Sequence, residues 1–382
     1  MKNKPVFLTK VLKSITEINK NEWDSIFPPI AESYNFFKTI EETLTHQFKP
    51  YYIAIYENSQ IMCLAPCFIM EYPLETTLKG FFKKIILGLK HFMPRLFTLR
   101  IFVCGCAAAE GRIGIRNFTR RDIIEALICE MHFLAKKENA ALITFKDFSQ
   151  GYIKLFTPLA GAGFHRMDSY PAVELDVRFK SFEDYLSSLS RATRKGLKRK
   201  FRTIEEEVKI ELEVTNELGE LLDKAYELYL NNLGKSEVQF EKLSKDFFKK
   251  ISQNMPEETK YFLWRINGKL VAFDLCLVLG DTLVDEYIGM DYDFAYKYHL
   301  YYVTFRDILS WCIEGGIHKY QSGALGYDPK KRLDFKFIPE YVYVKHLNRF
   351  LNFLFGLLCL LLKPENFDPV LKSVKKEINN EN

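Results

Sequence analysis

The chain has 382 residues, of which 48% are hydrophobic, 27% charged and 15% aromatic. These fractions exclude a disordered chain, a collagen-like repeat and a small disulfide scaffold, and the length favours two domains over one. The net charge of +5, from 54 Lys and Arg against 49 Asp and Glu, is too small to indicate a nucleic-acid binder by itself. Any anion site must therefore be a local cluster of basic residues.

The N-terminal segment has neither an uninterrupted apolar stretch nor a small-residue cleavage site, so we expect no secretory signal and a cytoplasmic protein. The eight cysteines lie in apolar surroundings. The closest pairs, Cys63 with Cys67 and Cys104 with Cys106, have no histidine at metal-ligand spacing. We therefore expect reduced core thiols and no metal site.

Two segments about 200 residues apart are each typical of a β-hairpin. Residues 52–67 and 261–276 both contain two apolar runs joined by a polar turn, at Glu57–Gln60 and at Ile266–Lys269. Asn and Gly in these turns favour a tight connection between antiparallel strands.

A helix and a strand follow each hairpin. The two helices share the pattern Thr-x-Arg-Asp-Ile, at 119–123 and at 304–308, and the strands are expected at 141–148 and 317–325. The order hairpin, strand, helix, strand thus occurs twice, which predicts a duplication.

Two apolar segments bear on membranes. Residues 78–93 place apolar side chains at helical spacing among four lysines, which is typical of an interfacial anchor; the alternative is a surface helix packed on the protein's own core. Residues 350–362 would form an apolar helix of about 20 Å, too short to span a bilayer. We expect peripheral contact with an anionic membrane, on its inner face, through both segments.

Residues 191–202 contain seven basic side chains in twelve. Six of them share one face of a helix, where like charges repel one another and an anionic partner would relieve the repulsion. The alternative is a solvated face neutralised by Glu205–Glu207. The basic residues assigned to the anion site are Arg191, Arg194, Lys195, Lys198 and Arg199.

The hairpin with its Asn-Gly-Lys turn, followed by a strand and a crossover helix, resembles the fold of the GNAT acyl-CoA N-acyltransferases. The tandem arrangement resembles the FemAB-like branch of that superfamily, on the stretch 261–339 and on the basic helix at 191–202. The resemblance implies an α/β (α+β) chain with two tandem GNAT-like domains, each a mixed, mostly antiparallel sheet flanked by helices. We place the N-terminal domain at 1–165, the C-terminal acyltransferase domain at 166–349, and an apolar helix with a charged tail at 350–382.

The resemblance also implies acyl transfer to an amine. Strand 281–290 is the counterpart of the strand that supplies the base in GNAT enzymes, and Asp285 and Glu286 on it alternate to opposite faces. We expect Glu286 to face the cleft, with Asp291 in reserve and Gly289 marking a bulge. FemAB-like enzymes have a lysine near position 330, where it would stabilise charge at the carbonyl. The candidate catalytic residues are Glu286, Asp291, Lys330 and Tyr287, and Tyr302 and Arg306 join the basic helix as donor-binding residues.

The sequence departs from typical GNAT enzymes at 291–302, where their glycine-rich pyrophosphate loop has no counterpart. The leading hypothesis is N-acyl transfer from an acyl thioester, with acyl-CoA as co-substrate and no permanently bound cofactor. The second is a FemAB-type transferase that uses aminoacyl-tRNA on a peptidoglycan or envelope precursor; nucleic acid is a partner only in this case. Residues 216–256 predict only two moderate helices, which argues against the long helical hairpin of such enzymes. The third is a non-catalytic, membrane-associated binding protein.

Overall fold

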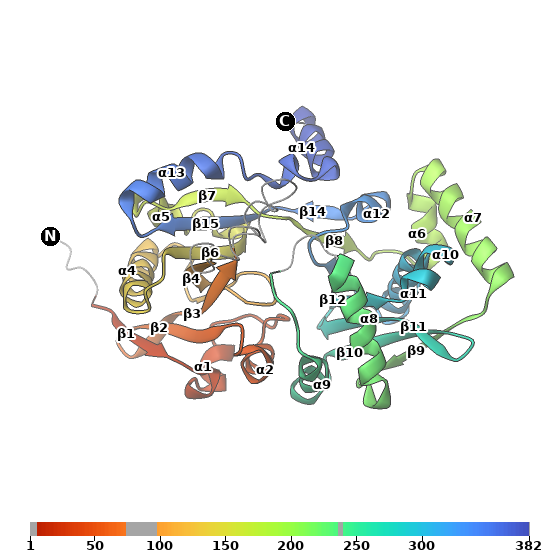
Figure 1. Ribbon diagram of the computed structural model, residues 1–382, viewed down its shortest axis with the longest axis horizontal. Helices are drawn as coiled ribbons and strands as arrows, with labels where there is room; N and C mark the ends of the chain where they lie inside the picture. The colour runs from red at the N-terminus through yellow and green to blue at the C-terminus, as the bar shows by residue number, and fades with distance from the viewer. Residues whose placement is uncertain (1–5, 74–97, 236–239, 382) are drawn as a thin grey trace, which may run out of the picture. The chain divides into compact units, whose positions relative to one another are not determined.

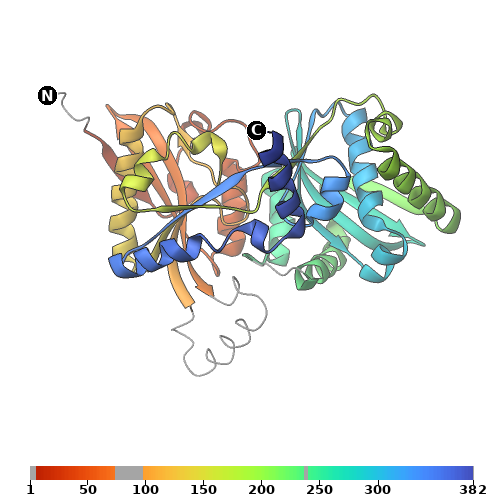
Figure 2. The same cartoon turned by 90° about the horizontal axis from the view of Figure 1, so that it is seen from above.

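A computed structural model describes residues 6–73, 98–235 and 240–381 (Figures 1 and 2). The chain divides into two compact units. The first contains residues 1–170, 238–241 and 339–382, and the second contains residues 171–237 and 242–338. The expected anchor at 78–93 lies outside the described residues.

The first unit is built on a mixed sheet with the strand order β1-β2-β3-β4-β6-β15-β7, and the short β5 pairs with β3. Neighbouring strands are antiparallel except β4 and β6. The strands are β1 (Leu8–Leu12), β2 (Lys49–Glu57), β3 (Gln60–Pro73), β4 (Thr98–Cys104), β5 (Gly114–Ile115), β6 (Leu142–Ser149), β7 (His165–Asp168) and β15 (Glu340–His346).

The second unit repeats this arrangement in the order β9-β10-β11-β12-β13-β8-β14. Here β12 and β13 are the parallel pair, and the other neighbours are antiparallel. The strands are β8 (Ala172–Asp176), β9 (Ile210–Thr215), β10 (Thr259–Ile266), β11 (Lys269–Leu279), β12 (Thr282–Met290), β13 (Lys319–Ser322) and β14 (Lys336–Ile338). The predicted architecture, two tandem domains each built on a mixed, mostly antiparallel sheet, is confirmed.

The sixth strand of each sheet is formed by chain that has just left the other sheet: β15 in the first sheet and β8 in the second. After β7 the chain leaves the first sheet and forms β8 in the second; after β14 it returns and forms β15 between β6 and β7. The ranges expected from sequence differ here, because 166–170 and 339–349 belong to the first unit. Pairing across more than 170 residues, as between β15 and β7, leaves no local pattern in the sequence.

Both predicted hairpins are present with two-residue turns. Asn58 and Ser59 join β2 to β3, and Asn267 and Gly268 join β10 to β11, all four with positive φ. This backbone conformation matches the twist of the flanking strands and is tolerated best by Asn and Gly.

Helices cover the sheets of both units (Figures 1 and 2). In the first unit, α4 buries Ile123, Leu127 and Met131 in a core with side chains of β2, β3, β4 and β6. The helices of this unit are α1 (Lys20–Asp24), α2 (Tyr34–Leu44), α4 (Arg121–Lys137), α5 (Thr157–Gly161), α13 (Arg349–Cys359) and α14 (Pro369–Glu381). Those of the second unit are α6 (Phe182–Ser188), α7 (Arg191–Glu207), α8 (Leu222–Lys235), α9 (Lys245–Asn254), α10 (Tyr292–Lys297), α11 (Leu300–Glu314) and α12 (Tyr327–Arg332).

Within 216–256 the structure has the two moderate helices α8 and α9, as the sequence predicts. None of the helices in the described part of the chain is long and apolar enough to cross a bilayer.

Candidate active site

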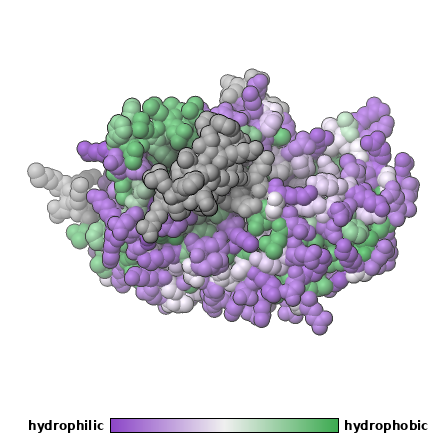
Figure 3. Space-filling model, viewed as in Figure 1, coloured by the Kyte–Doolittle hydropathy of each residue, from purple (hydrophilic) through white to green (hydrophobic). Residues whose placement is uncertain are grey.

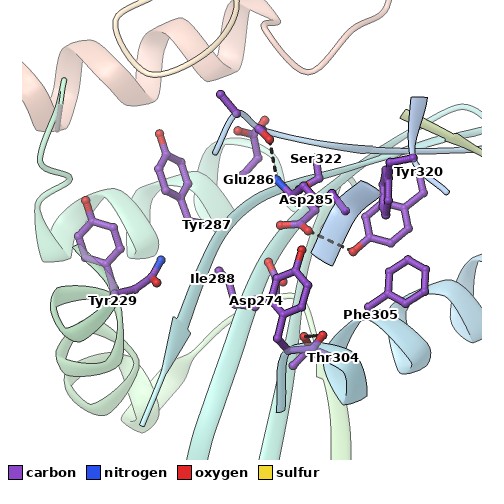
Figure 4. A pocket seen from close by; sticks show the side chains of 16 residues that line it. Tyr229, Asp274, Asp285, Glu286, Tyr287, Ile288, Thr304, Phe305, Tyr320 and Ser322 are labelled. Atoms are coloured by element: carbon purple, nitrogen blue, oxygen red, sulfur yellow. Dashed lines mark hydrogen bonds between the residues drawn. The ribbon is translucent and has the colours of Figure 1, made fainter. Parts of the chain in front are cut away.

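The two parallel strands of the second unit pair over only four residues. Their ladder runs from Thr282 opposite Lys319 to Asp285 opposite Ser322, and β12 then continues to Met290 while β13 ends. A cavity of about 170 Å³ begins where the strands part (Figure 4). Its lining residues are Tyr229, Asn232, Asp274, Asp285, Glu286, Tyr287, Ile288, Tyr301, Thr304, Phe305, Tyr320, Ser322, Gly323, Ala324, Lys330 and Phe335.

A β-bulge in β12 brings both of its carboxylates to this cavity. Cys276 on β11 lies opposite Asp285 and Leu275 lies opposite Tyr287, so Glu286 is the extra residue. The bulge interrupts the alternation of faces, and Asp285, Glu286 and Tyr287 all line the cavity. The expectation that only one of the two carboxylates faces the cleft is therefore wrong.

Gly289 does not form the bulge that the sequence suggested. It pairs regularly with Phe273, three residues beyond the actual bulge. A Cβ at this position would lie 2.4 Å from Cε1 of Phe273 and 2.6 Å from the backbone nitrogen of Tyr229. Glycine is therefore needed for the close approach of α8 to the sheet.

Asp274 forms a buried carboxyl pair with Asp285. Its side chain is 1% exposed, and its Oδ2 atom has no hydrogen-bond partner among the described residues. Burial and the neighbouring Asp285 hold the pKa of Asp274 well above its ordinary value. The Tyr320 hydroxyl donates a hydrogen bond to Oδ2 of Asp285 at 3.1 Å. The raised pKa favours the protonated form of Asp274, so this carboxyl can exchange a proton with a bound group.

Sequence reasoning missed Asp274. The available signal is that it is the one acidic residue within β11, whose other positions after Lys269 are apolar. An ionisable group in a strand that is otherwise fully apolar is a candidate functional residue.

Lys330 is a buried cation at the same cavity, 7% exposed. Its Nζ donates a hydrogen bond to the Gly323 carbonyl oxygen at 2.7 Å. Burial lowers the pKa of Lys330 to about 8, although Asp285 and Asp274 favour its charged form. The lysine that the resemblance implied thus lies on the same cavity as three acidic side chains.

Tyrosines complete the lining. Tyr287 and Tyr301 line the cavity, and burial raises the pKa of Tyr301, so its hydroxyl stays protonated at neutral pH. Tyr302 does not line it; the ring of Tyr302 lies under the Nζ of Lys200, at 5.2 Å from the ring centroid.

Asp291 and Arg306 are not among the lining residues and are engaged in ion pairs. Asp291 caps α10 and binds the Lys269 ammonium at 2.8 Å. Burial raises the pKa of Asp291, but the ion pair with Lys269 lowers it by more, so the pKa lies below its ordinary value. The guanidinium of Arg306 binds Asp307 at 2.8 Å and Glu205 at 3.1 Å. Both residues are held by neighbouring side chains.

The basic helix α7 has the predicted single charged face. Leu197, Phe201 and Ile204 are buried on its inner side. Of the outer residues, Arg194 donates to the Ser187 carbonyl oxygen at 3.0 Å and Lys198 binds Glu183. The three others have no partner among the described residues and are exposed; they are Arg191, Lys195 and Arg199.

The acidic end of α7 does not neutralise these three residues. Glu205 binds Arg306 and Glu206 binds Arg202, one turn beyond the last of them. The basic face therefore keeps uncompensated positive charge along the first turns of the helix.

Solved structures with the same architecture include FemX, at a TM-score of 0.58 and 12% identity over 91% of this chain and all of that chain. A tandem GNAT protein from the clavulanic acid biosynthesis pathway aligns at 0.53 and 10% identity, over 90% of this chain and 99% of that chain. The C-terminal domain of a putative lysylphosphatidylglycerol synthetase from Agrobacterium fabrum aligns at 0.52 and 14% identity, over 87% and 92%. At these identities the likeness shows the fold, which is a tandem GNAT-like fold.

The sequence also matches a family model. The model of the FemAB-like family, described as peptidoglycan biosynthesis or recognition, matches residues 14–351, and the chain belongs to this family.

A putative 8-amino-7-oxononanoate synthase 2 of Mycobacterium tuberculosis is 24% identical over 333 residues, covering 83% of this chain. The match covers 42% of that protein, so this chain spans less than half of its relative's length.

Proposed function

We propose that the second unit transfers an acyl group from an acyl thioester to an amine bound in the cavity. The observation that carries this proposal is the convergence of Asp274, Asp285 and Glu286 with Lys330 around one small space. An acidic cavity attracts an acceptor that enters as an ammonium ion, and the same carboxylates can then remove its proton.

The residues divide the chemistry as follows. Glu286 accepts a proton from the ammonium, and the free amine nitrogen attacks the carbonyl carbon of the donor, forming the C–N bond. The ammonium of Lys330 stabilises the negative charge that develops on the carbonyl oxygen. The C–S bond then breaks, and the thiolate takes a proton from the Tyr287 hydroxyl. The nitrogen, which still carries one proton more than an amide, returns a proton to the tyrosine oxygen, and the proton held by Glu286 is released to solvent. The Asp274–Asp285 pair keeps the lysine charged by favouring its protonated form.

Acyl-CoA is the leading donor in this proposal. The cavity opens between two strands that part, which suits a narrow, linear acyl arm. Arg191, Lys195 and Arg199 on α7 would bind the donor's phosphates. Arg306 is less suited to this role, because Asp307 and Glu205 already occupy its guanidinium.

A specific observation favours aminoacyl-tRNA as the second candidate donor. The 17 residues of α7 extend over about 25 Å, long enough to follow several phosphates of an RNA backbone. At the position of the missing glycine loop, α10 begins with the carboxylates of Asp291 and Asp293, which would repel a pyrophosphate. An amine of an envelope precursor fits either donor as acceptor, in line with the family's description.

Titration calorimetry with acetyl-CoA, a long-chain acyl-CoA and aminoacylated tRNA separates the two donors. Micromolar binding of a CoA ester, and transfer of its acyl group to an amine followed by mass spectrometry, would support the leading proposal. Binding of tRNA alone would replace it by the second candidate. Absence of acyl transfer from every one of these donors would contradict the proposal.

Charge substitutions test the donor site on α7. Replacing Arg191, Lys195 and Arg199 by glutamine should weaken donor binding at least about tenfold. A matched variant that removes three exposed lysines elsewhere, Lys137, Lys154 and Lys249, changes the net charge equally and should keep wild-type affinity. Equal losses in both variants would show a general charge effect and would remove α7 from the donor site.

A further inference from the structure

Helix α13 of the first unit turns a polar and small side toward its own sheet. The Asn352 side chain donates to the Gly163 carbonyl oxygen at 2.9 Å and accepts from the backbone nitrogen of His346 at 2.8 Å. One turn later, a Cβ on Gly356 would lie 2.4 Å from the His165 ring, so the helix contacts β7 through a glycine. These contacts fix which side of α13 faces the protein.

The opposite side of α13 and the turn after it are apolar and exposed (Figure 3). Phe350, Phe353, Leu360 and Leu361 are each between 64% and 68% exposed, and Leu357 is 52% exposed. The remaining exposed apolar residues of this surface are Leu351, Leu354 and Leu358. A helix that packs Asn352, Gly356 and the buried Cys359 against its own unit and exposes Leu and Phe is not explained by packing within that unit, and such a patch is typical of an interaction site.

The charges around this surface have one sign. From Tyr341 to Pro364 the chain has no acidic residue, and Arg349 and Lys363 border the apolar segment at its two ends. The next acidic residue, Glu365, binds Lys375 at 2.5 Å. The apolar surface is therefore bordered by two cations within a stretch that has no carboxylate, and Glu365, which lies near Lys363, is paired with Lys375.

The length of α13 decides between crossing and lying flat. Eleven residues extend over about 16 Å, roughly half the hydrocarbon thickness of a bilayer. A short helix with a broad apolar face and basic borders has the composition of an interfacial helix, which inserts its apolar side chains below the headgroups while its cations contact lipid phosphates.

We propose that residues 349–363 form a docking surface for a bilayer containing anionic lipids. The exposed Phe and Leu side chains insert at the boundary of headgroups and acyl chains, and Arg349 and Lys363 bind phosphates. This surface lies on the first unit and is independent of the transfer chemistry proposed for the second.

Vesicle cosedimentation of the full chain tests the surface. Phosphatidylcholine vesicles with about 30 mol% phosphatidylglycerol should bind the wild-type protein, and pure phosphatidylcholine should bind it more weakly. The double variant Leu357→Ser with Leu361→Ser should lose at least about tenfold in partitioning. The variant Arg349→Gln with Lys363→Gln should lose the preference for anionic lipid and its sensitivity to salt.

The matched control removes apolar side chains that are exposed elsewhere. Leu212 and Val214 on β9 are 40% and 36% exposed, and replacing both by serine should leave vesicle binding unchanged. Because the substituted leucine, valine and phenylalanine side chains are at least a third exposed and Lys363 is half-buried, circular dichroism and melting temperature of each variant are compared with the wild type, which they should match. The variant Phe353→Trp provides a direct readout, since its emission should shift to the blue on vesicle binding.

Three results would overturn the proposal. The wild-type chain does not bind anionic vesicles; the α13 serine variant and the β9 serine variant bind equally well; or the tryptophan at position 353 shows no shift while the protein is bound. Self-association of the wild type that Leu357→Ser with Leu361→Ser abolishes, without vesicle binding, would assign the surface to a second copy of this chain instead.

Discussion

The two units share one strand topology and differ at the point where their parallel strands part. In the second unit, β12 and β13 separate after Asp285 and Ser322, and the space between them is a cavity. In the first unit, β4 and β6 pair up to Cys104 and Phe145, and the chain after β4 folds back against β6. Gly111 lies so close to β6 that a Cβ would be 1.8 Å from the Lys146 carbonyl oxygen.

Each unit places a lysine at this point, half-buried in the first unit and buried in the second, with different partners. Lys146 of the first unit binds Asp147 at 2.6 Å and the Ala109 carbonyl oxygen at 3.1 Å. Burial disfavours the charged form of Lys146, but the neighbouring Asp147 favours it by more, so the pKa of Lys146 is raised. Lys330 has no such ion pair among the described residues; its pKa is lowered, and it faces a cavity.

Further ion pairs fill the remaining space in the first unit. Arg112 lies between Glu32 at 3.1 Å and Glu110 at 3.0 Å. A lysine whose charge is matched by a fixed carboxylate stabilises a fold, whereas a lysine of lowered pKa at an open space is suited to chemistry. The comparison is consistent with the proposal that catalysis belongs to the second unit, and it gives the corresponding region of the first unit ion pairs that fix its charges.

The largest expected effect is a difference between two matched lysine substitutions. Lys330→Met should lower kcat by about 10²- to 10³-fold with little change in melting temperature, because it removes charge stabilisation of the carbonyl oxygen. Lys146→Met should leave kcat nearly unchanged and destabilise the protein by about 3 kcal/mol, because it leaves Asp147 without its cation. Steady-state kinetics and thermal unfolding of both variants measure the difference. If Lys146→Met costs as much turnover as Lys330→Met at an unchanged melting temperature, the assignment of the two units is incorrect.

Two substitutions of carboxylates, one at Glu286 and one at Asp291, test the comparison within the second unit. Glu286→Gln should lower kcat at neutral pH by about 10²-fold while donor affinity stays the same, because the amine loses its base. Asp291→Asn should keep at least half of the wild-type kcat, since this carboxylate binds Lys269 and does not line the cavity. Turnover assays measure kcat and donor titration measures affinity, so the two together separate an effect on chemistry from an effect on binding. A fully active Glu286→Gln variant would remove Glu286 as the base.

Most of the topology and part of this site could be predicted from the sequence. The two hairpins follow from Asn at their turns, and the order of elements repeats. Glu286, Tyr287 and Lys330 were selected from strand position and family resemblance, and they line one cavity. Local patterns are sufficient for the hairpins and for the position of Glu286 and Tyr287 on a strand, because each depends on residues close together in the chain, whereas Lys330 came from the family resemblance.

The missed features depend on register and on distant pairing. The bulge at Glu286 is set by how β12 aligns with β11, which no alternation pattern specifies. The insertion of β15 between β6 and β7 joins segments that are far apart in sequence. Asp274 was missed because its role requires the side chain of Asp285 beside it, a contact that only the folded sheet creates.

The pH dependence of turnover tests the state of Lys330. Because burial lowers its pKa to about 8, its stabilising charge is present below that pH, and kcat should fall by about tenfold per unit above it. Lys330→Arg keeps its charge at any accessible pH, so this fall should disappear even if the variant is slower. The titration of Lys330 does not cause such a fall by unfolding the protein: its folded pKa lies below the ordinary 10.5, so between about 8 and 10.5 this group makes folding more favourable as the pH rises. A wild-type profile that stays flat to pH 10 would contradict the role of the ammonium.

The smallest expected effect concerns a buried carboxyl of the first unit. Glu340 is 5% exposed, and burial, together with Glu110 and Asp147, raises its pKa to about 10. Its folded pKa therefore lies above the ordinary 4.5, and the stability that it contributes is complete below pH 4.5 and is lost as the pH rises toward 10. Glu340→Gln keeps a neutral polar group and does not titrate, so its melting temperature should exceed that of the wild type by on the order of 5 °C at pH 9, and by less at pH 5. The same substitution should leave kcat unchanged, because the charges of the first unit serve its fold. A loss of turnover in Glu340→Gln at full stability would instead extend the active chemistry to both units.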